Sequence, residues 1–227
     1  MLKKIILLEY FTSLKNLSLI CYKNILPEAN AIICCIVKGF LKYSTLKEIN
    51  VIRNEQLDKI KDKRVIYHYT NSKTSVYSIL KRFKNKNYKI LLIAPETNKI
   101  SLKLHNSLEK NFKLLNCSQK IIKTFASKKL AFKSFKEKGL PCVENLKASL
   151  NSKMILKPTH GTGSEGNQII SGPIHPKKDQ ILQKFHNGLK GSFTMICNKN
   201  KFKIISCNIQ IIKLSKKSVN QVGLIYG

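Results

Sequence analysis

The sequence predicts an α/β fold with a parallel sheet in its first half and an α+β arrangement with antiparallel strands in its second half. Strand-like and helix-like segments alternate through the first half, which is typical of parallel strands covered by helices. From residue 142 onward, short apolar runs follow one another between glycine and asparagine turns. With 227 residues, 43% of them hydrophobic, the chain can form one large domain or two small ones.

In the first half, apolar runs bounded by turn residues predict the strands, and apolar residues at helical spacing predict the helices. Glu9 interrupts the apolar N-terminus and no small-residue cleavage site follows, so we expect a first strand there and not a signal peptide. The predicted strands are Ile5–Phe11, Val65–Tyr69, Lys89–Ala94 and Phe112–Leu115. The predicted helices are Pro27–Lys42, Ser75–Phe83 and Ser101–Asn111.

The second half opens with two predicted helices, Ser118–Thr124 and Ser127–Lys138. Gly139 and Pro141 follow the second helix and are suited to end it. We place the domain boundary between the last strand of the first half and the first of these two helices, which gives domains of residues 1–115 and 116–227. The strands predicted after the helices are Met154–Leu156, Gln168–Ser171, Ile181–Phe185, Phe193–Cys197, Phe202–Ile211 and Val222–Tyr226.

The formal net charge of +30 comes almost entirely from lysines that are spread along the whole chain. No aromatic and basic pattern of the kind that stacks bases accompanies them, so we expect a solvated lysine-rich surface that binds nucleic acid only non-specifically. A basic nucleic-acid-binding protein remains an alternative. The longest uncharged apolar stretch, Ala29–Val37, is too short to span a bilayer, so no membrane partner is expected.

The seven cysteines are odd in number and contain no C-x-x-C pair. This pattern argues against a disulfide framework and against a zinc site. Free thiols in a reducing compartment are the expectation, which places the protein in the cytoplasm.

The most informative segment runs from Met154 to Gly166 and contains an apolar run, a lysine, a proline and three glycines. Lys157 at the end of a buried strand is costly unless an anion meets it. The glycine-rich loop after Pro158 can expose backbone N–H groups to the same anion. We therefore expect a grip on nucleotide phosphates, with an exposed strand-end lysine and an ordinary hairpin turn as the alternatives.

Taken in order along the chain, several segments resemble the ATP-grasp superfamily, and more narrowly its tyramine–glutamate ligase type. The resemblance implies that residues 1–115 are a Rossmann-like pre-ATP-grasp domain and residues 116–227 an ATP-grasp domain. The segments that carry it are Leu7–Ser13, Ala94–Asn98, Leu115–Ser118, Ser127–Lys129, Lys157–Gly166 and Gln183–His186.

The resemblance implies ATP-dependent ligation of a small carboxylate, such as glutamate, to an amine through an acyl phosphate. It implies that Lys129 and Lys157 contact the phosphates, and that a mobile glycine lid closes over them. The main chain at the end of the strand after the lid would read the adenine edge. The implied ATP-binding residues are Lys129, Lys157, Gly161, Thr162, Gly163, Ser164, Gly166, Gln183, Phe185 and His186.

The sequence departs from the family pattern at several positions. Lys128 stands where the family has an aspartate, and Lys184 where it has the hinge glutamate. The family binds Mg²⁺ through late carboxylates, but no Asp or Glu follows Asp179, so no metal ligands and no catalytic residues are assigned. We expect a chain truncated before the metal-binding motif, or a non-catalytic remnant. Such a chain fits a homodimer or a completing polypeptide, and leaves enzyme activity open.

Overall fold

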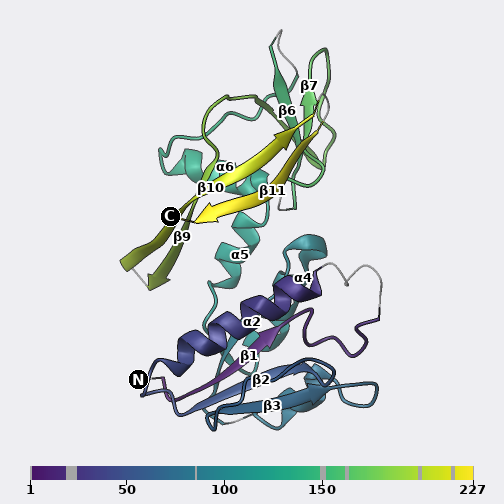
Figure 1. Cartoon of the computed structure of the whole chain (residues 1–227). Helices are drawn as coiled ribbons and strands as arrows, with labels where there is room; N and C mark the ends of the chain where they lie inside the picture. Colours follow the sequence, from purple (N-terminus) through teal and green to yellow (C-terminus); the bar gives the residue numbers. More distant parts are fainter. Residues whose placement is uncertain are drawn as a thin grey trace. The chain divides into compact units, whose positions relative to one another are not determined.

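The chain divides into two compact units, Met1–Ile122 and Lys123–Gly227, and the division falls within the short helix α5 (Gln119–Phe125) (Figure 1). The structure is a computed structural model that describes residues 2–18, 25–84, 86–148, 152–161, 164–198, 201–215 and 218–226.

The first unit is built on a five-stranded parallel sheet with the strand order β3-β2-β1-β4-β5. Residues 5–8 of its central strand are at most 2% exposed, as expected for a strand covered on both faces. The elements of this unit are β1 (Lys4–Glu9), α2 (Leu26–Leu41), β2 (Glu48–Asn54), β3 (Val65–Thr70), α3 (Val76–Lys81), β4 (Lys89–Ile93), η1 (Thr97–Lys99), α4 (Ile100–Glu109) and β5 (Lys113–Leu114).

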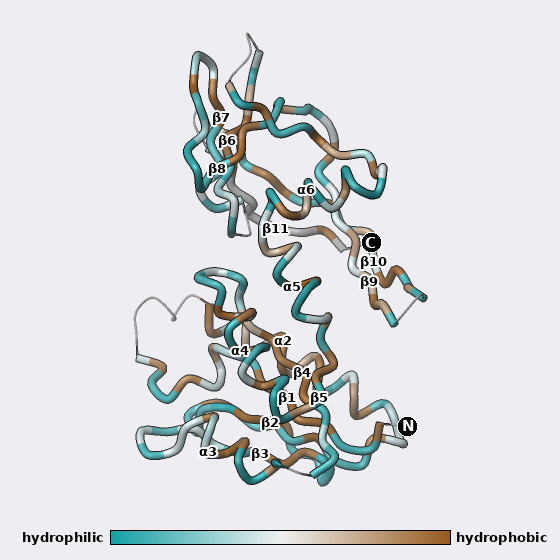
Figure 2. Tube along the Cα trace, turned by 180° about the vertical axis from the view of Figure 1, so that it is seen from behind, coloured by the Kyte–Doolittle hydropathy of each residue, from teal (hydrophilic) through white to brown (hydrophobic). Residues whose placement is uncertain are grey.

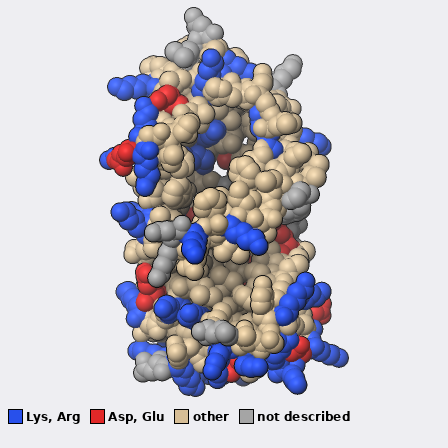
Figure 3. Space-filling view, turned by 90° about the vertical axis from the view of Figure 1, so that its left-hand side faces the viewer, with Lys and Arg blue, Asp and Glu red and all other residues tan. Residues whose placement is uncertain are grey.

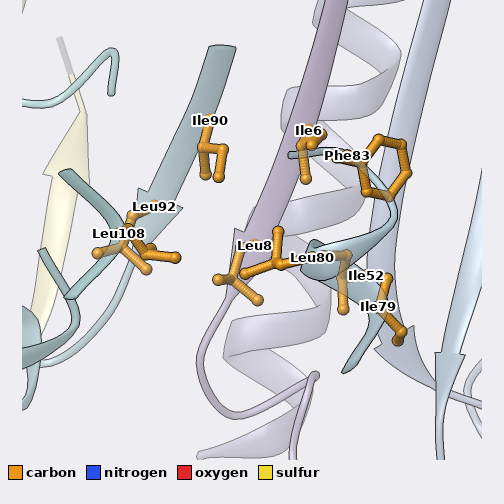
Figure 4. Packing of buried hydrophobic residues seen from close by; sticks show 9 residues of the cluster. All are labelled: Ile6, Leu8, Ile52, Ile79, Leu80, Phe83, Ile90, Leu92 and Leu108. Carbon is orange, nitrogen blue, oxygen red and sulfur yellow. The ribbon is translucent and has the colours of Figure 1, made fainter. Parts of the chain in front are cut away.

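Helices cover both faces of this sheet. Helix α2 packs through Ile33 on the face that presents Leu7. Helices α3 and α4 contribute Leu80 and Leu108 to the opposite face, where they share a core with Leu8 (Figure 4). The tube in Figure 2 is correspondingly hydrophobic along β1 and β4. This three-layer unit confirms the α/β class expected for the first half.

Strand β2 is a central strand of the sheet that the sequence did not predict. Its polar residues Asn50, Arg53 and Asn54 are at most 2% exposed. The side chain of Asn50 donates to Glu48 Oε1 at 2.9 Å, and its Oδ1 lies 2.8 Å from His68 Nε2. Polar residues thus interrupt the apolar positions of β2, and the segment lacks the continuous apolar run by which a buried strand is recognised.

The second unit contains two three-stranded antiparallel sheets, with the orders β7-β6-β8 and β11-β10-β9. Met154, Leu156 and Leu182 of the first sheet form its buried core cluster. These sheets confirm the antiparallel second half of the predicted fold. The elements of this unit after α5 are α6 (Lys128–Glu137), β6 (Met154–Pro158), β7 (Gln168–Ile170), β8 (Gln180–Lys184), β9 (Gly191–Asn198), β10 (Lys201–Leu214) and β11 (Val219–Tyr226).

Positive side chains are scattered over the molecular face in Figure 3 and do not gather into one block. This distribution agrees with the even spread of lysines along the sequence. None of the helices in the described part of the chain combines the length and the apolar character that a membrane crossing requires.

Glu48 ties several elements of the first unit together. Its Oε1 accepts a hydrogen bond of 2.6 Å from Tyr88 Oη, and its Oε2 lies 3.0 Å from Lys4 Nζ. Partial burial raises the pKa of Glu48, but hydrogen bonds from Tyr88, Asn50 and Lys4 lower it more, so that the pKa falls from 4.5 to about 2. The stabilisation by this carboxylate is therefore fully present above about pH 4.5 and is lost as the pH falls toward 2.

Glu48→Gln is expected to remove part of the acid sensitivity of the protein. Because the carboxylate is partly screened by solvent, we expect the wild type to lose about 1–2 kcal/mol more unfolding free energy than the variant between about pH 5 and pH 2.5. Urea denaturation at each pH measures this difference. Glu137→Gln is the control, because the Glu137 side chain is 63% exposed and its ion pair with Lys133 spans 3.8 Å. Parallel profiles for Glu48→Gln and the wild type would contradict the assignment.

Candidate nucleotide-binding site

Strand β6 carries its lysine on the face opposite to its core residues. Met154 and Leu156 are 0% and 4% exposed and pack into the core. Side chains alternate along a strand, so Ile155 and Lys157 lie on the other face. There they line a cleft of about 250 Å³, slightly smaller than the roughly 300 Å³ at which typical ligand pockets begin.

Both sheets of the second unit contribute to this cleft. One wall comes from β6 and from the end of β8, and the other comes from Gln210, Ile212 and Leu214 of β10 together with Val219 of β11. None of the described residues that line the cleft is acidic. The cleft is therefore a mixed apolar and basic space between two sheets, which suits a flat heterocycle with an anionic tail.

The ammonium group of Lys157 is half-buried and has a neutral partner. Its Nζ donates to Gln183 Oε1 at 2.9 Å, and Gln183 Nε2 is held in turn by Asn145 Oδ1 at 3.0 Å. Burial, reinforced by the positive charge of Lys128, lowers the pKa of Lys157. No ion pair joins Lys157 to a carboxylate in the described part of the chain. Such a charge is poorly compensated, and an anion in the cleft would stabilise it.

A second lysine reaches the glycine loop from helix α6. The Ser127 side chain caps the helix by accepting from the Leu130 N–H, and the Lys128 N–H donates to the Thr159 carbonyl at 2.8 Å. The Lys128 Nζ then donates to the Gly161 carbonyl at 2.9 Å. The cap and the main-chain bond together fix the direction in which Lys128 leaves the helix.

Lys129, which the family resemblance assigns to the phosphates, points elsewhere. Its exposed ammonium donates to the Lys178 carbonyl at 2.6 Å, and it is not among the residues that line the cleft. Successive residues of an α-helix point about 100° apart, so the two adjacent lysines leave the helix in different directions. In this structure Lys128 faces the loop.

The loop after β6 depends on backbone conformations that glycine adopts readily. Gly161 and Gly166 have φ values of 116° and 71°. A Cβ atom on Gly166 would lie 2.9 Å from Pro158 Cγ, so only glycine lets the loop fold back against the end of the strand.

Of the other loop residues predicted to bind ATP, Ser164 lies among the described residues. Ser164 lines the cleft with a φ of 64°, and its carbonyl accepts from the Asn167 N–H at 3.1 Å. Asn167 also lines the cleft. Thr162 and Gly163 lie outside the described residues.

Phe185 and His186 lie at the end of β8 and both line the cleft. The Phe185 N–H donates to the Lys153 carbonyl at 3.0 Å, and the His186 carbonyl accepts from Lys190 Nζ at 3.0 Å. The ammonium groups of Lys153 and Lys190 lie 4.6 and 5.6 Å from the centroid of the Phe185 ring. An aromatic ring with cations beside it therefore stands at the cleft, at the same end as Gln183.

The second unit also resembles a known domain family in sequence. Residues 125–226 match the sequence model of the ATP-grasp domain. The second unit has the fold of an ATP-grasp domain. No match was found among curated protein sequences.

Solved structures with the same fold cover nearly the whole chain. An ATP-grasp superfamily protein from Archaeoglobus fulgidus has a TM-score of 0.70 at 21% identity, over 93% of this chain and 62% of that one. The biotin carboxylase domain of the Hydrogenobacter thermophilus 2-oxoglutarate carboxylase has a TM-score of 0.59 at 13% identity, over 94% and 51%. The D-alanine–D-alanine ligase from Bacillus anthracis has a TM-score of 0.51 at 11% identity, over 100% and 71%. The chain thus spans 62% and 51% of the length of the first two.

The described residues of the second unit do not fit a magnesium site. Mg²⁺ requires oxygen ligands that normally include carboxylates. Within the described ranges, no three His, Cys, Asp or Glu side chains lie close enough together to hold a metal ion. The described residues of the cleft therefore offer cations and neutral polar groups, and no set of carboxylates suited to Mg²⁺.

Sequence reasoning missed the residues that form the far wall of the cleft and the second cation. Gln210 and Ile212 line the cleft from the long strand β10. The sequence around them contains no motif that indicates a ligand site. The role of Lys128 could have been recognised from the sequence. It directly follows Ser127, a typical N-cap residue, and the first position of a helix has a defined direction relative to its cap.

Gly166→Ala is expected to destabilise the loop through both its positive φ and its contact with Pro158. We expect a loss of about 2–3 kcal/mol of unfolding free energy, measured by urea denaturation. Gly172→Ala is the matched control, because Gly172 has a φ of 131° but nothing within 4 Å of its added Cβ, and it should lose only about 1 kcal/mol. Equal losses in the two variants would show that the contact with Pro158 is not a constraint.

Proposed function

We propose that the cleft binds ATP and that the chain is the nucleotide-binding part of an ATP-dependent carboxylate–amine ligase. The observation that carries this proposal is the half-buried Lys157 ammonium, which faces the cleft with an amide oxygen as its partner. The glycine loop and Lys128 lie beside it. The match of residues 125–226 to the ATP-grasp domain supports the same function.

In this proposal the phosphates replace neutral partners of two lysines. Lys157 Nζ leaves Gln183 Oε1, and Lys128 Nζ leaves the Gly161 carbonyl, so that both bind phosphate oxygens. The anion raises the depressed pKa of Lys157 and keeps it protonated. Loop N–H groups from Gly161 to Gly166, with the Thr162 and Ser164 hydroxyls, complete the grip. Lys129 is assigned a supporting role that requires it to leave the Lys178 carbonyl.

The end of β8 is proposed to bind the adenine. The Phe185 N–H is bonded to the Lys153 carbonyl, so we assign recognition to the Phe185 carbonyl and the His186 N–H. A carbonyl accepts from the adenine amino group, and an adjacent N–H donates to a ring nitrogen. The apolar side chains of Ile155 and Ile212 line the cleft and are proposed to pack against the flat faces of the purine.

The reaction proposed from the family resemblance has two balanced steps. A carboxylate oxygen attacks the γ-phosphorus of ATP, and ADP leaves as the acyl phosphate forms. The amine nitrogen then attacks the acyl carbon, the amide bond forms, phosphate leaves and the nitrogen loses a proton. The lysines of this cleft contribute by orienting the phosphates and neutralising their charge. Glutamate and an aromatic amine of the tyramine type are the narrower proposal for the substrates.

Any magnesium ligands are assigned to residues other than the described lining of this cleft, supplied by a completing polypeptide or a second copy of the chain. Turnover by the chain alone is therefore a separate question from nucleotide binding. The cysteines described are all free thiols, which supports the proposal of a cytoplasmic protein.

Lys157→Met is expected to weaken binding of a fluorescent ATP analogue by about 10- to 100-fold, because it removes a charge-assisted hydrogen bond of about 1.5–3 kcal/mol. Fluorescence titration measures both proteins. Lys133→Met is the matched control, because it removes an exposed lysine from helix α6 and should bind like the wild type. Lys128→Met and Lys129→Met compare the two adjacent lysines, and the larger loss is expected for Lys128.

Identical titration curves for Lys157→Met and the wild type would contradict the proposed site. Binding without turnover would favour the non-catalytic remnant. Absence of ATP binding together with salt-dependent binding of RNA or DNA would favour the basic nucleic-acid-binding alternative.

A further inference from the structure

A buried arginine lies at the carboxyl end of strand β2 in the first unit. The register pairs Leu8 with Ile52, which places Arg53 beside Glu9 at the same edge of the sheet. The Arg53 residue is 0% exposed. Ligands of open parallel sheets bind outside the carboxyl ends of the strands, so a buried cation at this edge is in a position where ligands are commonly met.

Among the residues that the structure describes, the guanidinium of Arg53 has a single hydrogen-bond partner. Its Nη2 donates to Asn30 Oδ1 at 2.6 Å, while Nε and Nη1 have no partner. The Tyr67 ring lies 5.8 Å from Cζ and offers only a cation–π contact. Nε carries one hydrogen and Nη1 carries two, so at least three N–H groups remain without an acceptor.

No carboxylate of the described chain compensates this charge. No Asp or Glu lies within ion-pairing distance of Arg53 in the ranges that the structure describes. Glu9, its neighbour on β1, uses its two oxygens to accept from the N–H groups of Phe11 and Thr12 at 3.1 and 2.7 Å. By contrast, Arg64 has Asp62 and the Leu41 carbonyl as partners.

We infer that Arg53 binds the carboxylate of a small-molecule ligand. Asn30 occupies only one hydrogen of Nη2, so one edge of the guanidinium still presents two parallel N–H groups, whichever hydrogen Asn30 takes. That fork matches the two oxygens of a carboxylate. Because the guanidinium is closed off in this structure, binding requires local opening at the strand ends. The identification of this ligand with the acid substrate rests on the proposed ligase function, whereas the carboxylate binding does not.

The arginine content of the chain allows a direct test on the intact protein. Arg53, Arg64 and Arg82 are its only arginines, so ¹⁵N-arginine labelling gives at most three Nε–H signals in an NMR spectrum. Arg64→Lys and Arg82→Lys each remove one of the others and thereby identify the Arg53 signal. Titration with glutarate is expected to shift the Arg53 signal to saturation, and glutaramide, its uncharged analogue, is expected to leave it in place.

A glutarate titration that moves no signal, or moves only that of Arg64 or Arg82, overturns the inference. An equal shift of the Arg53 signal by inorganic phosphate overturns the assignment to carboxylates. Lys157→Met separates this site from the ATP site, because it should retain the full glutarate shift whatever its effect on nucleotide binding. Loss of the glutarate shift in Lys157→Met would also contradict an independent site.

Discussion

The candidate site of the second unit is organised around one lysine ammonium, that of Lys157, which faces a cleft and has a neutral amide oxygen as its partner. Lys157 reaches this position because β6 alternates, with Met154 and Leu156 anchoring one face in the core. Gln183 fixes the ammonium, and Asn145 fixes Gln183. Folding of this sheet thus places a cation in partly desolvated space. This arrangement is stable with water or an amide as a partner, but becomes considerably more favourable with an anion.

The residues around Lys157 add to the positive charge and to the polar groups at this edge of the cleft. Gly166 lies close against Pro158, and Ser164 and Asn167 on either side of it line the cleft. The Ser127 cap begins α6 beside the same loop. Burial lowers the pKa of Lys157, and the positive charge of Lys128 on this helix lowers it further. Two neighbouring cations repel each other, and this repulsion lowers the stability of the fold when no anion is bound. A bound polyphosphate would neutralise both charges and remove the repulsion.

The sequence predicted the parts of the site that are local and missed those that depend on tertiary contacts. A lysine at the end of an apolar run before a glycine loop is a local pattern, and Lys157 was found by it. The choice between Lys128 and Lys129 depends on helix phase, and the wall formed by Gln210 and Ile212 depends on how two sheets face each other. In the fold, β2 was missed because Asn50, Arg53 and Asn54 are polar. The hydrogen bonds that make Asn50 and Asn54 compatible with a buried strand depend on tertiary contacts, which the sequence does not show.

A structure of the chain with a non-hydrolysable ATP analogue tests the central claim most directly. The measurement is the position of Lys157 Nζ relative to the phosphates and to Gln183 Oε1. We expect a phosphate oxygen within about 3 Å of Lys157 Nζ, as charge-assisted hydrogen bonds require, with the adenine against the end of β8. A nucleotide bound elsewhere, or a Lys157 that still donates to Gln183 beside an empty cleft, would contradict it.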